Sequence, residues 1–193
     1  MKQTGIPFII LCLFIASCGE KKEETPGKQF LSARSIIEQD IANIDTSLFS
    51  IMRLDIIDSS RTDTSFVPRE KFREMAAEFL NLPDISDKKN SKDYTETSMY
   101  DAATGKVILS YQPLPDKKVL LQRQDVAVAP NVGGTSEVSS FYFDYVQVSK
   151  DSSIEKKMLW QVNRSFQITT LRQLPAQPEK VTTLRVVWNE PQY

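Results

Sequence analysis

The sequence predicts an α+β domain in which two N-terminal helices pack against one face of an antiparallel sheet of roughly six strands. Three observations predict this fold. Apolar residues recur at helical spacing in two stretches between residues 32 and 81. From residue 94 onward, apolar and polar residues alternate with a period of two, which is typical of strands that bury one face. The loops between these strands are too short for parallel crossovers, so an antiparallel meander is expected.

The first helix is predicted within residues 32–55. Ser35 and Glu38 fit a capping box, in which the serine accepts a hydrogen bond from the amide of residue 38 and the glutamate reaches back. Asp40 falls outside the apolar stripe of this helix. The second half of the segment also alternates partly with a period of two, so a strand over residues 49–57 is the alternative to one long helix. The stripe has steps of four and three and consists of Ile37, Ile41, Ile44, Leu48 and Ile51.

A second helix is predicted over residues 68–81. Pro68 suits the first helical position, because the N–H that proline lacks has no intrahelical partner there. Pro83 follows the end of the helix, and the mostly polar stretch at residues 84–92 is expected to form a solvated linker. The apolar face of this helix consists of Phe72, Met75, Ala76, Phe79 and Leu80.

The predicted strands cover residues 95–100, 107–112, 118–128, 138–148, 158–169 and 182–188. The first two form a hairpin in which Gly105 is expected to take a positive φ. The fifth strand alternates most regularly, and Trp160 and Phe166 are expected to lie buried against the helices. Arg164 is the one polar residue on that apolar face. An unpaired buried arginine is costly, so it is expected either at the rim of the sheet or beside an anionic group.

The N-terminus predicts export and lipidation. Lys2 precedes an apolar run from Ile6 to Ile15, which is too short to span a bilayer, and Ala16-Ser17-Cys18 follows it. This arrangement resembles the lipobox of bacterial lipoproteins. The resemblance implies that residues 1–17 are a signal peptide and that Cys18 is acylated, so that acyl chains hold the protein on the membrane.

Residues 18–31 are expected to form a lipidated, flexible tether, and residues 32–193 a single domain. The charged run at residues 20–24 is similar to the short signals that send lipoproteins of the Bacteroidota to the cell surface; a plain spacer is the alternative. The expected location is therefore the cell envelope, with a lipid anchor in the outer membrane. The sequence leaves open whether the domain faces the periplasm or the cell surface.

Composition narrows the expected chemistry. The chain has 24 basic and 25 acidic residues, a balance that does not favour nucleic acid as a partner. It contains no histidine, and its two cysteines, Cys12 and Cys18, both precede the expected domain. Histidine and cysteine are the usual general bases, nucleophiles and transition-metal ligands. We therefore expect no cofactor, and a protein that is not an enzyme.

Three functional hypotheses follow. The first is a lipid-anchored protein that binds an envelope partner, with Tyr142, Asp144, Tyr145 and Arg164 as contact residues. The second is a carrier or chaperone for an apolar ligand. A twisted sheet with helices against its concave side is similar, in architecture only, to the half-barrels of lipoprotein and lipid carriers. The third is a hydrolase that uses carboxylates such as Asp125 and Asp144, because paired carboxylates cleave glycosides without histidine.

Overall fold

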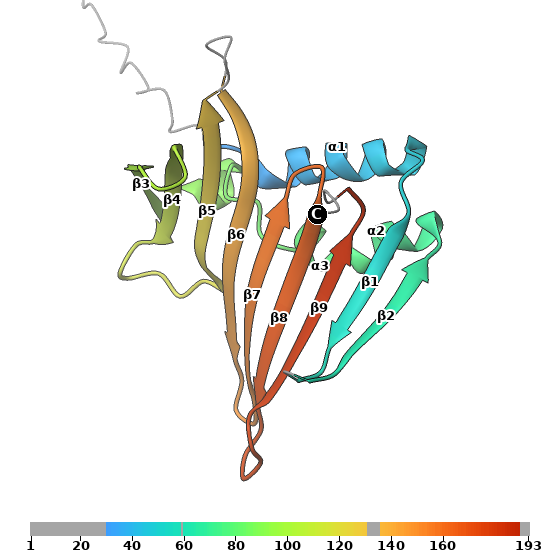
Figure 1. Cartoon of the computed structure of the whole chain (residues 1–193). Coiled ribbons are helices and arrows are strands. Elements are labelled where there is room, and N and C mark those ends of the chain that lie inside the picture. Colours follow the sequence, from blue (N-terminus) through green and yellow to red (C-terminus); the bar gives the residue numbers. More distant parts are fainter. Residues whose placement is uncertain (1–29, 59, 131–135, 190–193) are drawn as a thin grey trace, which may run out of the picture.

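A single antiparallel sheet of nine strands dominates the structure, a computed structural model that describes residues 30–58, 60–130 and 136–189. The strand order is β2-β1-β9-β8-β7-β6-β5-β4-β3, and the helical segments lie on one side of the curved sheet (Figure 1). The antiparallel α+β prediction is confirmed at this level, but the prediction of about six strands was wrong. The strands are β1 Ile51–Ile56, β2 Thr62–Val67, β3 Tyr94–Asp101, β4 Lys106–Pro113, β5 Leu121–Pro130, β6 Ser136–Val148, β7 Ser153–Gln161, β8 Ser165–Gln173 and β9 Lys180–Val187.

The first helix, α1, covers Ala33–Thr46 and is shorter than the favoured prediction. Ser32, not Ser35, is its N-cap, and the Ser32 Oγ accepts a hydrogen bond from the amide of Ser35 at 3.2 Å. The helix ends where the Ser47 amide and hydroxyl both donate to the Ile44 carbonyl, at 3.1 and 3.0 Å. Leu48, which was predicted to lie on the apolar stripe, is 98% exposed beyond this end.

The alternative prediction of a strand after residue 48 is confirmed, because Ile51–Ile56 forms β1. This strand lies between β2 and β9 and is antiparallel to both. The β2 strand was missed. Its sequence is mostly polar and every residue before Val67 is exposed, so it lacks the alternation that identifies a half-buried strand.

The predicted second helix exists in segments rather than as one helix. A 3-10 turn at Arg69–Lys71 leads into α2, Phe72–Met75, and then α3, Ala77–Leu80. The chain tightens at Ala76, where ψ is −6° and the carbonyl accepts a hydrogen bond from the Phe79 amide at 3.0 Å. Phe72 and Phe79 are nevertheless buried, as the spacing predicts. A further short helix, α4, covers Lys88–Ser91 in the predicted linker.

Residues 158–169 form a hairpin and not one strand. The chain reverses at Asn163, whose φ is 59°, a left-handed conformation that asparagine tolerates. The apolar alternation continues across the turn because Trp160 and Phe166 are directly opposite each other on β7 and β8. The hairpin predicted from the strands at residues 95–100 and 107–112 is confirmed as β3 and β4, and Gly105 in its turn takes a φ of +67°.

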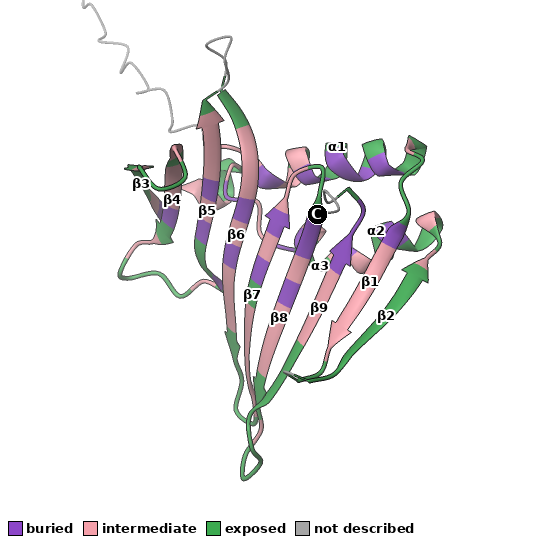
Figure 2. Cartoon of the chain, viewed as in Figure 1, coloured by how far each residue is buried: buried purple, intermediate pink, exposed green. Residues whose placement is uncertain are grey.

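The hydrophobic core lies between the helical segments and the half of the sheet that they cover. Trp160 is 0% and Phe166 1% exposed, and the Trp160 ring is 5.1 Å from that of Phe79. Buried residues are concentrated towards the helix-covered half of strands β6 to β9, and exposed residues dominate their far ends (Figure 2). The helices therefore cover only part of the concave face.

The core residues that the structure describes extend from Phe30 to Trp188 and form one hydrophobic cluster. Among the described residues, no helix is both long and apolar enough to cross a membrane. The predicted signal peptide and Cys18 lie outside the described residues, as does most of the predicted tether.

Candidate functional site

The open half of the concave face is the candidate site. Strands β6 to β9 extend beyond α3, so none of the described helices lies over their far ends (Figure 1). Two adjoining hollows, both lined by Glu78 of α3, lie over this part of the sheet. We call this region the open trough.

The larger hollow of the trough has a volume of about 440 Å³. Its floor comes from β8 and β9, where Ile168 is buried and Leu184 is half-buried. Thr170 and Thr182 continue the floor towards the strand ends, and Lys180 stands at the margin. The hollow therefore combines an apolar floor with a polar outer part.

A charged pair from β1 borders the larger hollow. Arg53 and Asp55 occupy successive inward positions, and the arginine donates to the carboxylate from Nε at 2.8 Å and from Nη2 at 2.9 Å. The hydrogen bond to Asp55 raises the pKa of the Arg53 guanidinium above its ordinary value. Both charges are thus engaged with each other rather than available to a ligand.

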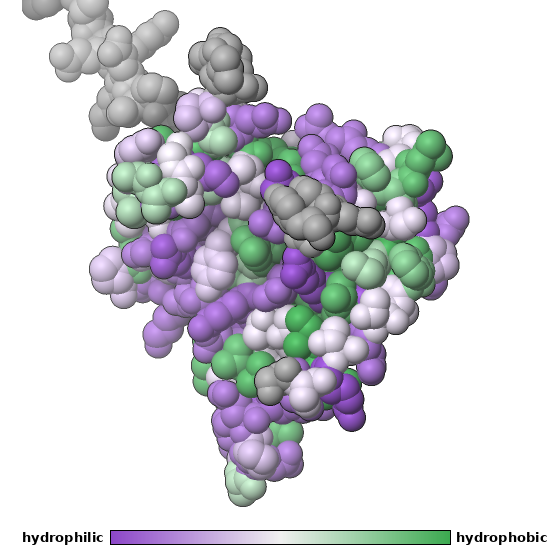
Figure 3. Space-filling model, viewed as in Figure 1, coloured by the Kyte–Doolittle hydropathy of each residue, from purple (hydrophilic) through white to green (hydrophobic). Residues whose placement is uncertain are grey.

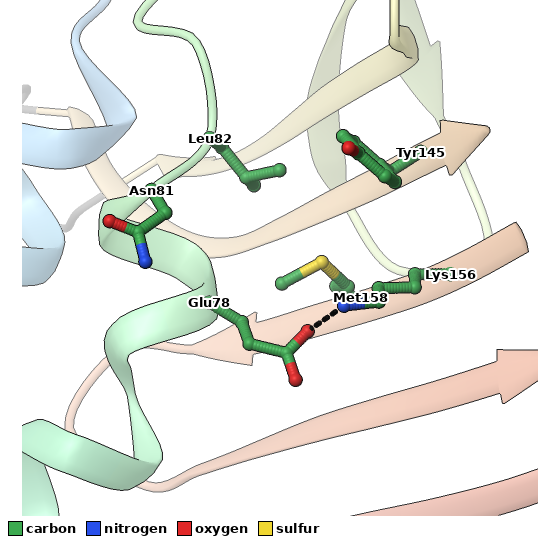
Figure 4. A pocket seen from close by; sticks show the side chains of 6 residues that line it. All are labelled: Glu78, Asn81, Leu82, Tyr145, Lys156 and Met158. Carbon is green, nitrogen blue, oxygen red and sulfur yellow. Dashed lines mark hydrogen bonds and ion pairs between the residues drawn. The ribbon is translucent and has the colours of Figure 1, made fainter. Parts of the chain in front are cut away.

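The smaller hollow, of about 160 Å³, lies between α3 and strands β6 and β7 (Figure 4). Met158 forms its floor, and Leu82 and Tyr145 form its sides. Lys156 of β7 forms an ion pair with Glu78 of α3 at the boundary of the two hollows. This contact holds the end of the helical segment against the sheet.

The structure does not bring the four predicted contact residues together. Tyr145 faces the trough, where its hydroxyl is 3.1 Å from the Gln147 Oε1. Tyr142 and Asp144 alternate with it on β6 and therefore face the convex side, where hydrophobic and hydrophilic residues are interspersed (Figure 3). Arg164 was expected at the rim of the apolar face or beside an anionic group. It is exposed in the β7–β8 turn, where Asn163 reverses the chain, and not within a strand.

Asp144 has an unusual environment on the convex face. Its Oδ1 atom is buried without a hydrogen-bond partner among the described residues. Partial burial, and then the charge of Glu155, raise the pKa of this carboxyl, while Lys157 and Arg123 oppose the rise. Burial is also the main cause that raises the pKa of the Tyr142 phenol.

The second predicted carboxylate, Asp125, lies nearby on β5. It forms an ion pair with Arg123 at 2.7 Å and accepts a hydrogen bond from Ser110. Register places Asp125 opposite Tyr142 and Asp144 opposite Arg123, so the two carboxylates are diagonal neighbours. Among the described residues, no group of three or more acidic side chains could hold a metal ion.

The placement of Asp40 outside the apolar stripe was misleading, and Lys156 was not singled out from the sequence. Asp40 is buried on α1 and accepts hydrogen bonds from the Trp160 Nε1 at 2.8 Å and the Asn163 amide at 2.9 Å. Burial is the main cause that raises the pKa of its carboxyl. Its position three residues after Ile37 could have placed it beside the buried stripe. Lys156, two residues before Met158, could likewise have been placed on the inward face by its alternation.

Comparison of the chain with protein-family models, with curated proteins and with solved structures found no match in any of the three.

Proposed function

We propose that the chain is a lipid-anchored, non-enzymatic protein of the cell envelope that binds a ligand in the open trough. The observation that carries the proposal is the pair of adjoining hollows over the uncovered half of the concave face. The larger one, at about 440 Å³, falls within the range of about 300–1,000 Å³ that is typical of small-molecule sites. This favours the carrier hypothesis over contact with a partner through the convex face.

The chemistry of the trough also favours binding over turnover. Its two carboxylates are both engaged by cations, Glu78 by Lys156 and Asp55 by Arg53. A carboxylate that acts as a general base must lie within hydrogen-bond reach of the proton that it removes, and these two are occupied by ion pairs with neighbouring side chains. The proposed anchor at Cys18 and the part of the proposed tether that precedes the core residue Phe30 would keep this binding domain close to the outer membrane.

A fluorescent probe tests the binding site. Residues 19–193, which include every core residue that the structure describes, are titrated with N-phenyl-1-naphthylamine, an uncharged apolar dye. Thr170→Trp places a large ring on the floor of the larger hollow and should reduce probe affinity at least tenfold. Gln167→Trp introduces the same ring on the same strand, three residues away and on the convex face, and serves as the matched control.

Equal probe binding by the two tryptophan variants and the parent chain would contradict the proposal, provided that all three melt at similar temperatures. Failure of the parent to bind the probe would contradict it as well. Hydrolysis of glycans, peptides or esters by the same domain, abolished by Asp144→Asn with the fold intact, would instead support the hydrolase hypothesis.

A further inference from the structure

The polarity of the open trough changes from row to row along its strands. Strand register places three rows of inward-facing residues side by side on β7, β8 and β9. The row nearest the helices is apolar, the next is mixed, and the outermost carries two cations. Along β8, the change from the apolar row to the cationic row spans four residue steps, from Ile168 to Arg172, or about 13 Å. The rows are Met158, Ile168 and Leu184; Lys156, Thr170 and Thr182; and Ile154, Arg172 and Lys180.

The cations of the outermost row are directly opposite each other. Arg172 on β8 pairs in register with Lys180 on β9, and both side chains are exposed. Like charges at opposed positions of neighbouring strands repel each other and destabilise a sheet. An anion that lies between the two side chains would offset this repulsion.

No carboxylate of the described residues supplies that partner, since neither Arg172 nor Lys180 forms an ion pair there. The other two cations of the trough differ, because Arg53 and Lys156 are both paired with acidic side chains. Among the described residues of the trough, the cations without a counter-charge therefore lie at the outer end of the larger hollow, which Lys180 lines.

We propose that the larger hollow binds a single-chain amphiphile with an anionic head group. Charge complementarity places the head group between Arg172 and Lys180. The apolar tail then runs along β8 and β9 over Thr170 and onto Ile168 and Leu184, towards the helices. This inference rests on the proposed binding function of the trough and adds the class of ligand and its direction.

The test compares two competitors of equal chain length and opposite charge. Residues 19–193 are loaded with N-phenyl-1-naphthylamine, and the dye is displaced with dodecanoate or dodecylammonium below their micelle-forming concentrations. Dodecanoate should displace the dye at a concentration at least tenfold lower, because the cationic head group meets repulsion instead of attraction. The advantage of dodecanoate should decrease when the ionic strength is raised.

Variants assign this preference to the two cations. The double variant Arg172→Gln/Lys180→Gln should bind dodecanoate, relative to the dye, about fivefold more weakly. This is the effect expected when the head group loses two exposed ion pairs. Lys157→Gln removes a cation from the convex face of β7 and should leave this ratio unchanged.

Two results would overturn the inference and leave the proposed function standing. One is equal competition by the two amphiphiles. The other is an unchanged ratio in the double variant, with the dye still bound in the trough. A parent chain that does not bind the dye would overturn both proposals.

Discussion

Removing the indole N–H of Trp160 should destabilise the fold measurably. Trp160 is fully buried among aromatic rings and donates its Nε1–H to Asp40 at 2.8 Å. Trp160→Phe keeps an aromatic ring in place but leaves the buried carboxylate with the Asn163 amide as its remaining donor. Leaving a buried polar group short of a partner costs about 1–3 kcal/mol, and we expect the free energy of unfolding to fall by that amount.

Trp160→Ala should be more damaging. Loss of a large core side chain costs about 3–5 kcal/mol, to which the lost hydrogen bond is added. The total approaches the whole stability of a typical domain, about 5–15 kcal/mol. Chemical denaturation of residues 19–193, followed by circular dichroism, measures both variants. A loss below about 1 kcal/mol for Trp160→Ala would show that this face of the sheet is not the core.

Two further predictions concern other parts of the chain. Cys18→Ala should release the full-length protein from the membrane fraction, because two or three acyl chains each contribute about 0.8 kcal/mol per buried methylene; full retention of the variant, measured by fractionation, would rule out a lipid anchor. Asp40→Asn should stabilise the fold at pH 7, since burial raises the pKa of the native carboxyl and the charged form is disfavoured in the folded state. On acidification, Asp40 is protonated at a higher pH in the folded chain than in the unfolded chain. Its contribution to the free energy of unfolding therefore becomes more favourable as the pH falls towards 4. The advantage of the asparagine should therefore shrink in denaturation curves recorded between pH 7 and pH 4, and a gap that widens on acidification would contradict the argument.

Regular alternation allowed much of the sheet to be predicted from the sequence. Strands β3 to β6 were placed correctly within a few residues, because each buries one face and is bounded by turn residues. The β7–β8 hairpin was missed because its tight turn preserves the apolar alternation, and the local signals of the turn are Asn163 and the polar Arg164 that follows it. Strand β2 gave no signal because it buries almost nothing.

The helical region was less predictable for physical reasons. Ile51 continues the spacing of the α1 stripe and is buried, so the pattern alone does not show that the helix ends at Thr46. Ser47, which forms the C-terminal cap, is the local signal for that end. The candidate site was predicted least well, since only Tyr145 of the four predicted contact residues faces the trough. The trough depends on which half of the sheet the helices leave uncovered, and that is a property of the assembled fold.

The central claim is that ligands bind in the open trough, and methyl NMR tests it most directly. Met158, Ile168 and Leu184 report on the trough, while Leu159 faces the convex side of β7 beside Met158. On titration of residues 19–193 with dodecanoate, we expect saturable chemical-shift changes at the three trough methyl groups and little change at Leu159. Changes centred on Leu159, or no saturable change at the trough methyl groups, would contradict the claim.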